Sequence, residues 1–360
     1  MILSRNNNPV TERIRQFQRL LKENHLDSYL VNKDTNIRYL TGFKASESWL
    51  LVTQKKSYYI TDFRYILEAK KALKNQAMVI QYTKSMAQAL FDLAKDLKIK
   101  SIGFDDRHLT LAMFNNLRKS CLKGISLRSV NNLVESLRMI KDAREIKLIK
   151  KALEIHASAL TYLHKIVQPG QAENSILLKL ESFVKQKNVG FSFDPIIAGG
   201  PNSCLPHAHV TQRVIKKNDI VLVDMGIDVN GYKSDLTRMF FFGKISKLIK
   251  DVEVAVKDAQ RQAIAMIKAG VRVSEVDLQA RKCLAKKGLE EYFGHSLGHG
   301  VGLDIHEAPR LSQLSSEILQ EGMVVTVEPA VYLPNKFGIR IEDMVLVTKN
   351  GCEVLSDNID

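Results

Sequence analysis

The sequence predicts an α/β domain followed by an α+β domain. In the first third of the chain, short apolar stretches alternate with amphipathic helical ones, a pattern typical of α/β layers. A long periodic stretch at 144–167 leads into apolar strands and glycine-rich loops, and helical patterns return at 245–269 and 274–287. Because a chain of 360 residues favours two domains over one, we place them at 1–133 and 134–360.

The first domain is expected to open with an amphipathic helix at 10–25, in which Thr11 would cap the first turn. Strands are then expected at 28–31, 49–53, 57–61, 78–82 and 101–104, and helices at 62–73, 85–97, 110–121 and, in the second domain, 172–188. No glycine-rich phosphate loop follows any of these strands, which disfavours a dinucleotide-binding role. We therefore expect the first domain to support the second.

Composition and charge restrict the classes of function. The chain is 45% hydrophobic and carries a net charge of +14, but its basic residues are scattered through helical segments such as 147–151. This distribution favours solvated helix faces over a nucleic-acid site. With no signal-peptide core at the N-terminus and no run approaching 18 apolar residues, we expect a cytoplasmic protein without membrane contact.

The four cysteines are far apart and form no CxxC pair, so reduced thiols are expected. Cys204 lies three residues before His207, which raises the idea of a cysteine nucleophile. Nothing else in the sequence completes that chemistry, so a small loop residue is the better interpretation.

The stretch 220–242 predicts a β-hairpin. An apolar run leads to Asn230 and Gly231, whose tolerance of positive φ suits a two-residue type I′ turn. A turn at these two residues places Val229 opposite Tyr232 and fixes the register of the whole hairpin.

This register brings two aspartates together. Asp224 falls opposite Thr237 and Asp235 opposite Gly226, and all four residues project from the same face. Because Gly226 has no side chain, we expect open space beside the carboxylates that an ion could fill. The alternative is a solvated polar face with two unrelated acids, but the apolar residues around them count against it.

Further candidate ligands lie near the C-terminus. A glycine-rich segment and two apolar strands carry His295, His299, His306, Glu328 and Glu342. Arg340 is expected on the same strand face as Glu342. Each residue alone is weak evidence for a metal site, since a histidine in such a turn is usually a loop residue and a lone strand glutamate is usually solvated.

Together, four carboxylates and one imidazole would neutralise two dications and leave room for a bridging hydroxide. Such an oxygen-rich set favours Mn²⁺, Co²⁺ or Fe²⁺ and describes a two-metal hydrolase.

These motifs resemble those of the pita-bread metallopeptidases, specifically aminopeptidase P and prolidase. The matching phrases are PHAH at 206–209, VDMGIDVNGYKSDLTR at 223–238, HSLGHGVGLDIHEAP at 295–309, TVEPAVY at 326–332 and IRIED at 339–343. NIRYLTGF and TDFRY in the first half are similar to the creatinase-type domain that accompanies this fold. The resemblance implies a creatinase/prolidase-type N-terminal domain at 1–133 and a pita-bread catalytic domain at 134–360.

The resemblance also implies roles for individual residues. The metal ligands would be Asp224, Asp235, His299, Glu328 and Glu342. His207 and His306 would orient the scissile carbonyl and steady the tetrahedral intermediate, and Glu328 would also assist proton transfer. On the substrate side, His295 and Tyr332 would line the proline pocket, and Arg340 would position Glu342. Many relatives have glycine where Ala330 stands, a difference that touches no ligand.

We therefore expect a dinuclear Xaa-Pro aminopeptidase, with two Mn²⁺ or Co²⁺ ions, acting on proline-containing peptides as a homodimer. A dipeptidase that cleaves only Xaa-Pro is the alternative within the class. Methionine aminopeptidase shares the ligands, but the large N-terminal domain disfavours it. A metal-free homologue that binds a partner or RNA, or a creatinase-like enzyme, is disfavoured because all five ligands are present.

Overall fold

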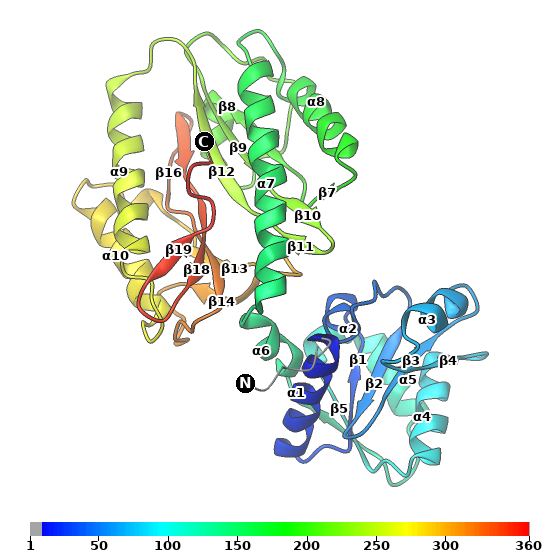
Figure 1. Cartoon of the computed structure of the whole chain (residues 1–360). Coiled ribbons are helices and arrows are strands. Elements are labelled where there is room, and N and C mark those ends of the chain that lie inside the picture. The colour runs from blue at the N-terminus through cyan, green and yellow to red at the C-terminus, as the bar shows by residue number, and fades with distance from the viewer. Residues whose placement is uncertain (1–8, 360) are drawn as a thin grey trace, which may run out of the picture. The chain divides into compact units, whose positions relative to one another are not determined.

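The computed structural model describes residues 9–359 and divides the chain between Arg138 and Met139 into two compact units. The first unit is an α/β layer and the second mixes long helices with several small sheets (Figure 1), so the predicted fold class is confirmed. The boundary expected after residue 133 falls within helix α6, Leu133–Met139. Among the described residues, no helix has the length and apolar character needed to cross a membrane.

The first unit is built on one six-stranded sheet in the order β4-β3-β2-β1-β5-β6. Its strands are β1 Ser28–Val31, β2 Trp49–Thr53, β3 Ser57–Thr61, β4 Met78–Gln81, β5 Ser101–Phe104 and β6 Ser126–Ser129. Its other helices are α1 Pro9–Glu23, α2 Asp34–Thr41, α3 Ile66–Ala72, α4 Met86–Asp96 and α5 Leu111–Ser120. Apolar residues of α4 and α5 pack on one face of the sheet, and Phe17 of α1 packs edge-on against Tyr29 on the other.

Several predicted details of this unit are wrong for local reasons. Thr11 is the third residue of α1 and not its cap, because Pro9 starts the helix where a missing N–H costs nothing. Helix α3 begins at Ile66 and not at 62, since the Asp62 carboxylate accepts the backbone N–H of Arg64 and forms a turn instead. Helix α2 and strand β6 were not predicted at all, because both stretches are short and rich in polar residues.

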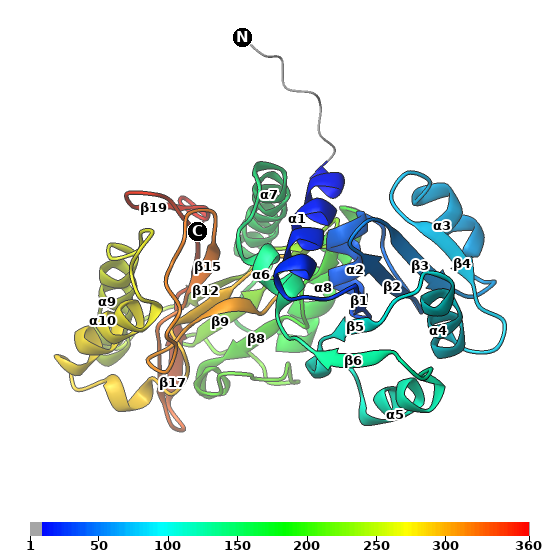
Figure 2. The ribbon, with the colours of Figure 1, turned by 90° about the horizontal axis from the view of Figure 1, so that it is seen from below.

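The second unit holds its strands between two pairs of helices (Figures 1 and 2). These helices are α7 Ala143–Ile166, α8 Glu173–Gln186, α9 Lys247–Ile264 and α10 Val273–Ala285. The strands are β7 Gly190–Phe191, β8 Ile196–Gly199, β9 Ile220–Met225, β10 Ile227–Val229, β11 Tyr232–Lys233, β12 Leu236–Phe241, β13 Gly298–Gly300, β14 Glu307–Leu311, β15 Val324–Val327, β16 Ala330–Leu333, β17 Phe337–Arg340, β18 Asp343–Val347 and β19 Cys352–Val354. Helices α7 and α8 share one apolar core with β8, β9, β10 and β12, while α9 and α10 share another with β15 to β18. Each core covers one side of the strands, and the site lies between strands drawn from both.

The hairpin formed by β9 to β12 has the predicted register. Asp224 pairs with Thr237 and Val229 pairs with Tyr232. Asn230 and Gly231 have φ values of 51° and 83°, as a type I′ turn requires. The Asn-Gly turn therefore sets which residues of the hairpin face the site.

A second hairpin, formed by β15 to β18, opens in its middle. Val327 pairs with Asp343 in one sheet and Ala330 pairs with Arg340 in another. Both pairs belong to the same register, and continuing it between them places Glu328 opposite Glu342 and Pro329 opposite Ile341. The two glutamates therefore face each other at the point where the paired strands change sheets.

Candidate active site

One cavity of about 650 Å³ in the second unit brings every predicted site residue together. Its wall includes His207, Asp224, Asp235, His295, His299, His306, Glu328, Tyr332, Arg340 and Glu342. Phe193, Ile196 and Ile305 add an apolar side that was not predicted from the sequence. The first two precede the PHAH motif by ten residues or more and carry no motif of their own. A cavity with apolar walls and convergent polar groups suits a small peptide.

The acidic centre of the cavity gathers around one imidazole. Potential ligand atoms of Asp235, His299 and Glu342 lie within 4.8 Å of one another. The Nε2 atom of His299 lies 3.3 Å from a Glu328 oxygen and 3.6 Å from an Asp235 oxygen. Nδ1 of His299 lies 3.1 Å from the Gly300 carbonyl, to which it donates. In the neutral ring this leaves the Nε2 lone pair pointing at carboxylates, an arrangement that calls for a cation between them.

The electrostatics of this centre are unbalanced. Burial, together with repulsion from neighbouring carboxylates, raises the pKa of both Asp235 and Glu342 well above the ordinary values. Burial also raises the pKa of Asp224, whose Oδ1 atom is buried with no hydrogen-bond partner. An unpaired buried oxygen and crowded carboxylates fit a site for divalent cations, which would supply the missing positive charge.

Glu328 differs from the other carboxylates. Burial alone would raise its pKa, but the hydrogen bond and positive charge of His299 outweigh this effect and lower it. The same pairing raises the pKa of His299 against the effect of burial. Glu328 is thus the acid of the cluster that is most readily kept ionised.

Arg340 connects the acids to the pocket wall. Its guanidinium donates to Asp224 at 2.5 Å, to the Thr237 hydroxyl at 3.0 Å and to the Tyr332 hydroxyl at 2.6 Å. Thr237 in turn donates to Glu342 at 2.8 Å. Arg340 was expected to act on Glu342 from the same strand, but β17 ends at Arg340, and Thr237 makes the link. That role was missed, although the predicted register already placed Thr237 beside Asp224.

His295 and Tyr332 are hydrogen-bonded to each other on the cavity wall. His295 Nδ1 lies 2.8 Å from the Ser296 carbonyl and so acts as donor, which leaves Nε2 to accept from the Tyr332 hydroxyl at 3.1 Å. Burial lowers the pKa of His295, which favours this neutral form, and burial raises the pKa of Tyr332 to about 12. With their polar atoms engaged, both side chains offer mainly ring surface to the cavity.

The two other predicted histidines, His207 and His306, are exposed on the cavity wall. The His306 ring lies edge-on to His299, with ring centroids 4.4 Å apart. Burial against its neighbours and the nearby charge of His299 lower the pKa of His306. His207 follows a short 3-10 helix, Gly200–Cys204, which is fixed by a bond from the Gly338 N–H to the Ser203 hydroxyl. Both rings are therefore free to meet a substrate.

The space expected beside Gly226 is filled by protein. A Cβ atom on Gly226 would lie 2.2 Å from the Ser234 carbonyl oxygen and 2.8 Å from the Ser192 Cβ. That expectation is therefore wrong. Gly226 lets neighbouring backbone approach closely, and the opening beside the two aspartates comes from the cavity on their side-chain face.

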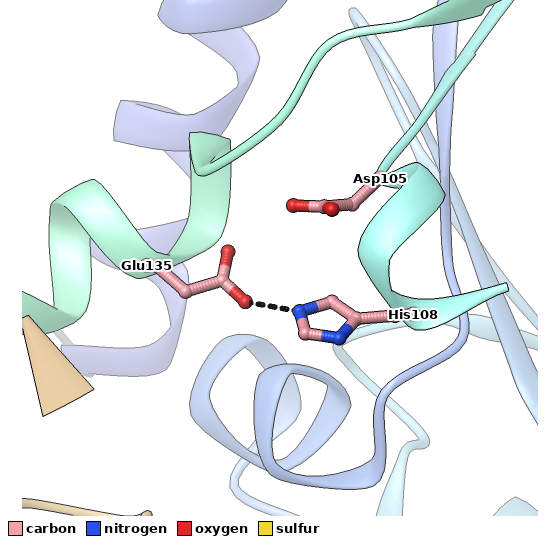
Figure 3. Close-up of side chains that lie close together, drawn as sticks. All are labelled: Asp105, His108 and Glu135. Atoms are coloured by element: carbon pink, nitrogen blue, oxygen red, sulfur yellow. Dashed lines mark hydrogen bonds and ion pairs between the residues drawn. The ribbon is translucent and has the colours of Figure 1, made fainter. Parts of the chain in front are cut away.

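A second group of acids and histidine lies in the first unit. Asp105, His108 and Glu135 converge there, with His108 bonded to Glu135 at 2.7 Å (Figure 3). Both Asp105 oxygens already accept hydrogen bonds from Arg107, and one also accepts the Asn132 N–H. This group is charge-balanced by the protein itself, and no motif in the sequence pointed to it.

Comparison with known proteins agrees with the two-unit description. Residues 147–349 match the model of metallopeptidase family M24, and residues 13–140 match the creatinase/prolidase N-terminal domain. An uncharacterized peptidase of Bacillus subtilis is 36% identical over 94% of this chain and 96% of its own. The structure of a Xaa-Pro dipeptidase from Bacillus anthracis superposes with a TM-score of 0.93, at 34% identity and covering 97% of this chain and 98% of that one. An X-Pro aminopeptidase from Thermotoga maritima gives a TM-score of 0.86, also at 34% identity, over 95% and 97% of the two chains.

Proposed function

Because the chain belongs to metallopeptidase family M24, we propose that it is an Xaa-Pro aminopeptidase that removes the N-terminal residue of peptides whose second residue is proline. The observation that carries this proposal is the buried, uncompensated acidic centre in a cavity with an apolar wall. We propose further that the enzyme acts in the cytoplasm as a homodimer, which sedimentation of the purified protein would test.

The proposed metal ligands are Asp224, Asp235, His299, Glu328 and Glu342. Their four carboxylates and one imidazole suit two oxygen-preferring dications such as Mn²⁺ or Co²⁺. When bound, such ions activate a water molecule and polarise the scissile carbonyl. Metal analysis of the purified protein distinguishes this enzyme from a metal-free binding homologue, which would retain no stoichiometric metal.

Proton transfer is assigned to Glu328. Its carboxylate lies 3.3 Å from His299 beside the proposed metal ligands, so it can accept a proton from the attacking water and pass it to the departing amine. His207 and His306 stand exposed on the wall, where an N–H of each can donate to the carbonyl oxygen as its negative charge develops. The lowered pKa of His306 leaves it a neutral donor at that pH.

The preference for proline is assigned to the His295 and Tyr332 wall. Their polar atoms are already paired with Ser296 and Arg340, so this part of the cavity has few acceptors left for a substrate amide. A Xaa-Pro bond has no amide N–H and needs none. A secondary amide would bring a donor that stays unpaired, at a cost of roughly 1–3 kcal/mol.

A matched pair of tripeptides tests this proposal. One carries proline and the other alanine at the second position, and both are hydrolysed by the Mn²⁺-loaded protein. We expect kcat/KM to fall by about 5- to 150-fold for the alanine peptide, as a loss of 1–3 kcal/mol implies. Varying the first residue should matter much less. Comparable efficiency for the two peptides would favour a general aminopeptidase.

One observation favours a dipeptidase as the second candidate. Arg310 is exposed on the cavity wall, and its Nε lies 3.3 Å from the Ser296 hydroxyl. A guanidinium there can pair with the free carboxylate of a dipeptide. Comparing Xaa-Pro, Xaa-Pro-Xaa and amidated Xaa-Pro separates the two functions, because a dipeptidase would lose activity on the second and third substrates.

A further inference from the structure

Glu328 and Glu342 lie where the strand pairing of their hairpin is interrupted. The backbone N–H of Glu328 donates to the Leu297 carbonyl at 2.8 Å, whereas that of Glu342 donates to the Thr237 carbonyl at 3.3 Å. Although the register sets the two residues opposite each other, Glu328 bonds to the residue directly before β13 and Glu342 bonds to β12. The strand pairing stops at Val327 and Asp343 on one side and at Ala330 and Arg340 on the other, and the two positions between them belong to neither ladder.

A single side chain spans the opening. Nε2 of Gln260, on α9, donates to the Val327 carbonyl at 3.0 Å and to the Ile341 carbonyl at 3.1 Å. Each carbonyl belongs to the residue directly before one of the glutamates. Pro329, which the register sets opposite Ile341, has no N–H with which to satisfy that carbonyl. Both amide hydrogens of Gln260 are thus used to hold the two strands at a set separation.

Burying the Gln260 amide costs free energy unless both of its hydrogens are bonded. Only 7% of the residue is exposed, and it lies on the apolar face of α9 with Val256, Ala259 and Ala263. A buried amide in an apolar core destabilises the fold unless it is hydrogen-bonded. An apolar side chain of similar length would fill the same volume but remove the donor that reaches the Ile341 carbonyl opposite Pro329.

We infer that Gln260 is a positioning residue that sets the separation of the Glu328 and Glu342 carboxylates and thereby the metal affinity of the centre. This inference rests on the proposed metal-binding function. Gln260 touches neither carboxylate and acts only through the backbone. Loss of a residue that orients ligands without binding metal commonly weakens metal affinity by about 10- to 100-fold.

The test is the full-length variant Gln260→Met, which keeps the length of the side chain and removes both donors. Metal-free protein is titrated with Co²⁺, and binding is followed by calorimetry and by the visible absorption of the bound ion. We expect Co²⁺ to bind about 10- to 100-fold more weakly, with an altered absorption spectrum. At saturating metal, kcat should fall while KM changes little.

Gln262, on the same helix, provides the matched control. Its amide donates to the Cys283 sulfur at 3.2 Å and accepts from Gln279, both on α10. Gln262→Met therefore removes a polar contact between two helices without touching the hairpin. We expect it to lower thermal stability and leave Co²⁺ affinity and spectrum unchanged, which separates positioning from general destabilisation.

Unchanged Co²⁺ affinity and spectrum in Gln260→Met would overturn the inference while leaving the proposed function intact. If that variant does not fold, Gln260→Glu supplies the same test. Its carboxylate matches the amide in shape but offers at most one hydrogen, so weakened Co²⁺ binding supports the inference and unchanged binding overturns it. Failure of the unaltered protein to bind Co²⁺ would remove both the proposed function and this inference.

Discussion

Two clusters in this chain offer nearly the same donors in opposite electrostatic settings. They are Asp105, His108 and Glu135 in the first unit and Asp235, His299 and Glu342 in the second. In both, an imidazole and two carboxylates bring ligand atoms within 4.8 Å of one another. By donor type and distance alone, either could hold a metal ion.

The pKa shifts separate them. In the first unit, burial raises the pKa of Asp105, but hydrogen bonds from Arg107 and from the Asn132 N–H outweigh this and lower it. For Glu135, hydrogen bonds from Asn36 and His108 likewise outweigh burial. In the second unit, burial and mutual repulsion raise the pKa of the corresponding acids well above ordinary values. The proposed metal centre is thus distinguished by negative charge that the protein leaves unbalanced, and not by the ligand atoms alone.

The largest expected effect follows from removing one of those unbalanced charges. We expect Asp235→Asn to lower kcat/KM by more than the 10²–10³-fold typical of a single lost stabilising group, and to reduce bound metal. In the metal-free protein the same change should raise stability by roughly 1–3 kcal/mol, because it relieves repulsion with buried neighbours. Metal analysis, peptide hydrolysis and thermal unfolding measure the three outcomes. Unchanged metal content and activity would sink the ligand assignment.

A second expectation concerns the imidazole beside the centre. His306→Ala should lower kcat by about 10²–10³-fold while leaving the metal content unchanged, because His306 is assigned to the substrate and not to the ions. His108→Ala in the first unit is the matched control and should alter neither quantity. Loss of an ion from His306→Ala would mean that His306 is a metal ligand and that its assignment to the substrate is wrong.

The sequence predicts the geometry of the aspartate pair because a local turn determines it. Asn230 and Gly231 both take positive φ, and this fixes the pairing of Asp224 with Thr237 several residues away. The gathering of distant histidines and glutamates was predictable only through the family resemblance, since no local rule sets where those strands meet.

Other features depend on contacts between remote segments. Gln260 stands out in the sequence only as a polar residue on an apolar helix face, and its two carbonyl partners lie more than sixty residues away. The filled space at Gly226 depends on Ser192, which reaches the hairpin from a separate strand–loop segment. The balanced cluster in the first unit likewise requires Asp105 and Glu135 to meet across a gap in sequence that carries no motif.

A smaller effect is expected when the balanced cluster is disturbed. Asp105→Asn should lower the stability of the protein by about 1–3 kcal/mol, because it weakens charge-assisted bonds from Arg107. Metal content and kcat/KM should stay at the unaltered values. Thermal unfolding and metal analysis check both statements, and a loss of metal from this variant would break the comparison by making the first cluster a metal site too.

The smallest effect is a difference in how acid acts on the two clusters. A lowered pKa, as for Asp105 and Glu135, gives stability that is present above the ordinary values of 3.8 and 4.5 and is lost as pH falls through the folded-state values. A group with a raised pKa has the opposite effect on stability as pH falls. In metal-free protein, ionised Asp235 and Glu342 destabilise the fold above their raised values, and this penalty disappears on acidification.

Metal-free protein should therefore gain stability from the second cluster as pH falls from 7 toward 4.5, before the first cluster begins to lose its own contribution. Because histidines also titrate in this range, the free energy of unfolding is measured against pH for each protein. The slope of each variant is then subtracted from that of the unaltered protein. Relative to Asp235→Asn, the unaltered protein should gain stability on acidification; relative to Asp105→Asn, it should lose stability below about pH 3.8. Bound Mn²⁺ should abolish the first difference, since the ions favour the ionised carboxylates, and leave the second unchanged. Equal slopes for all three metal-free proteins would mean that the two clusters do not differ in charge balance.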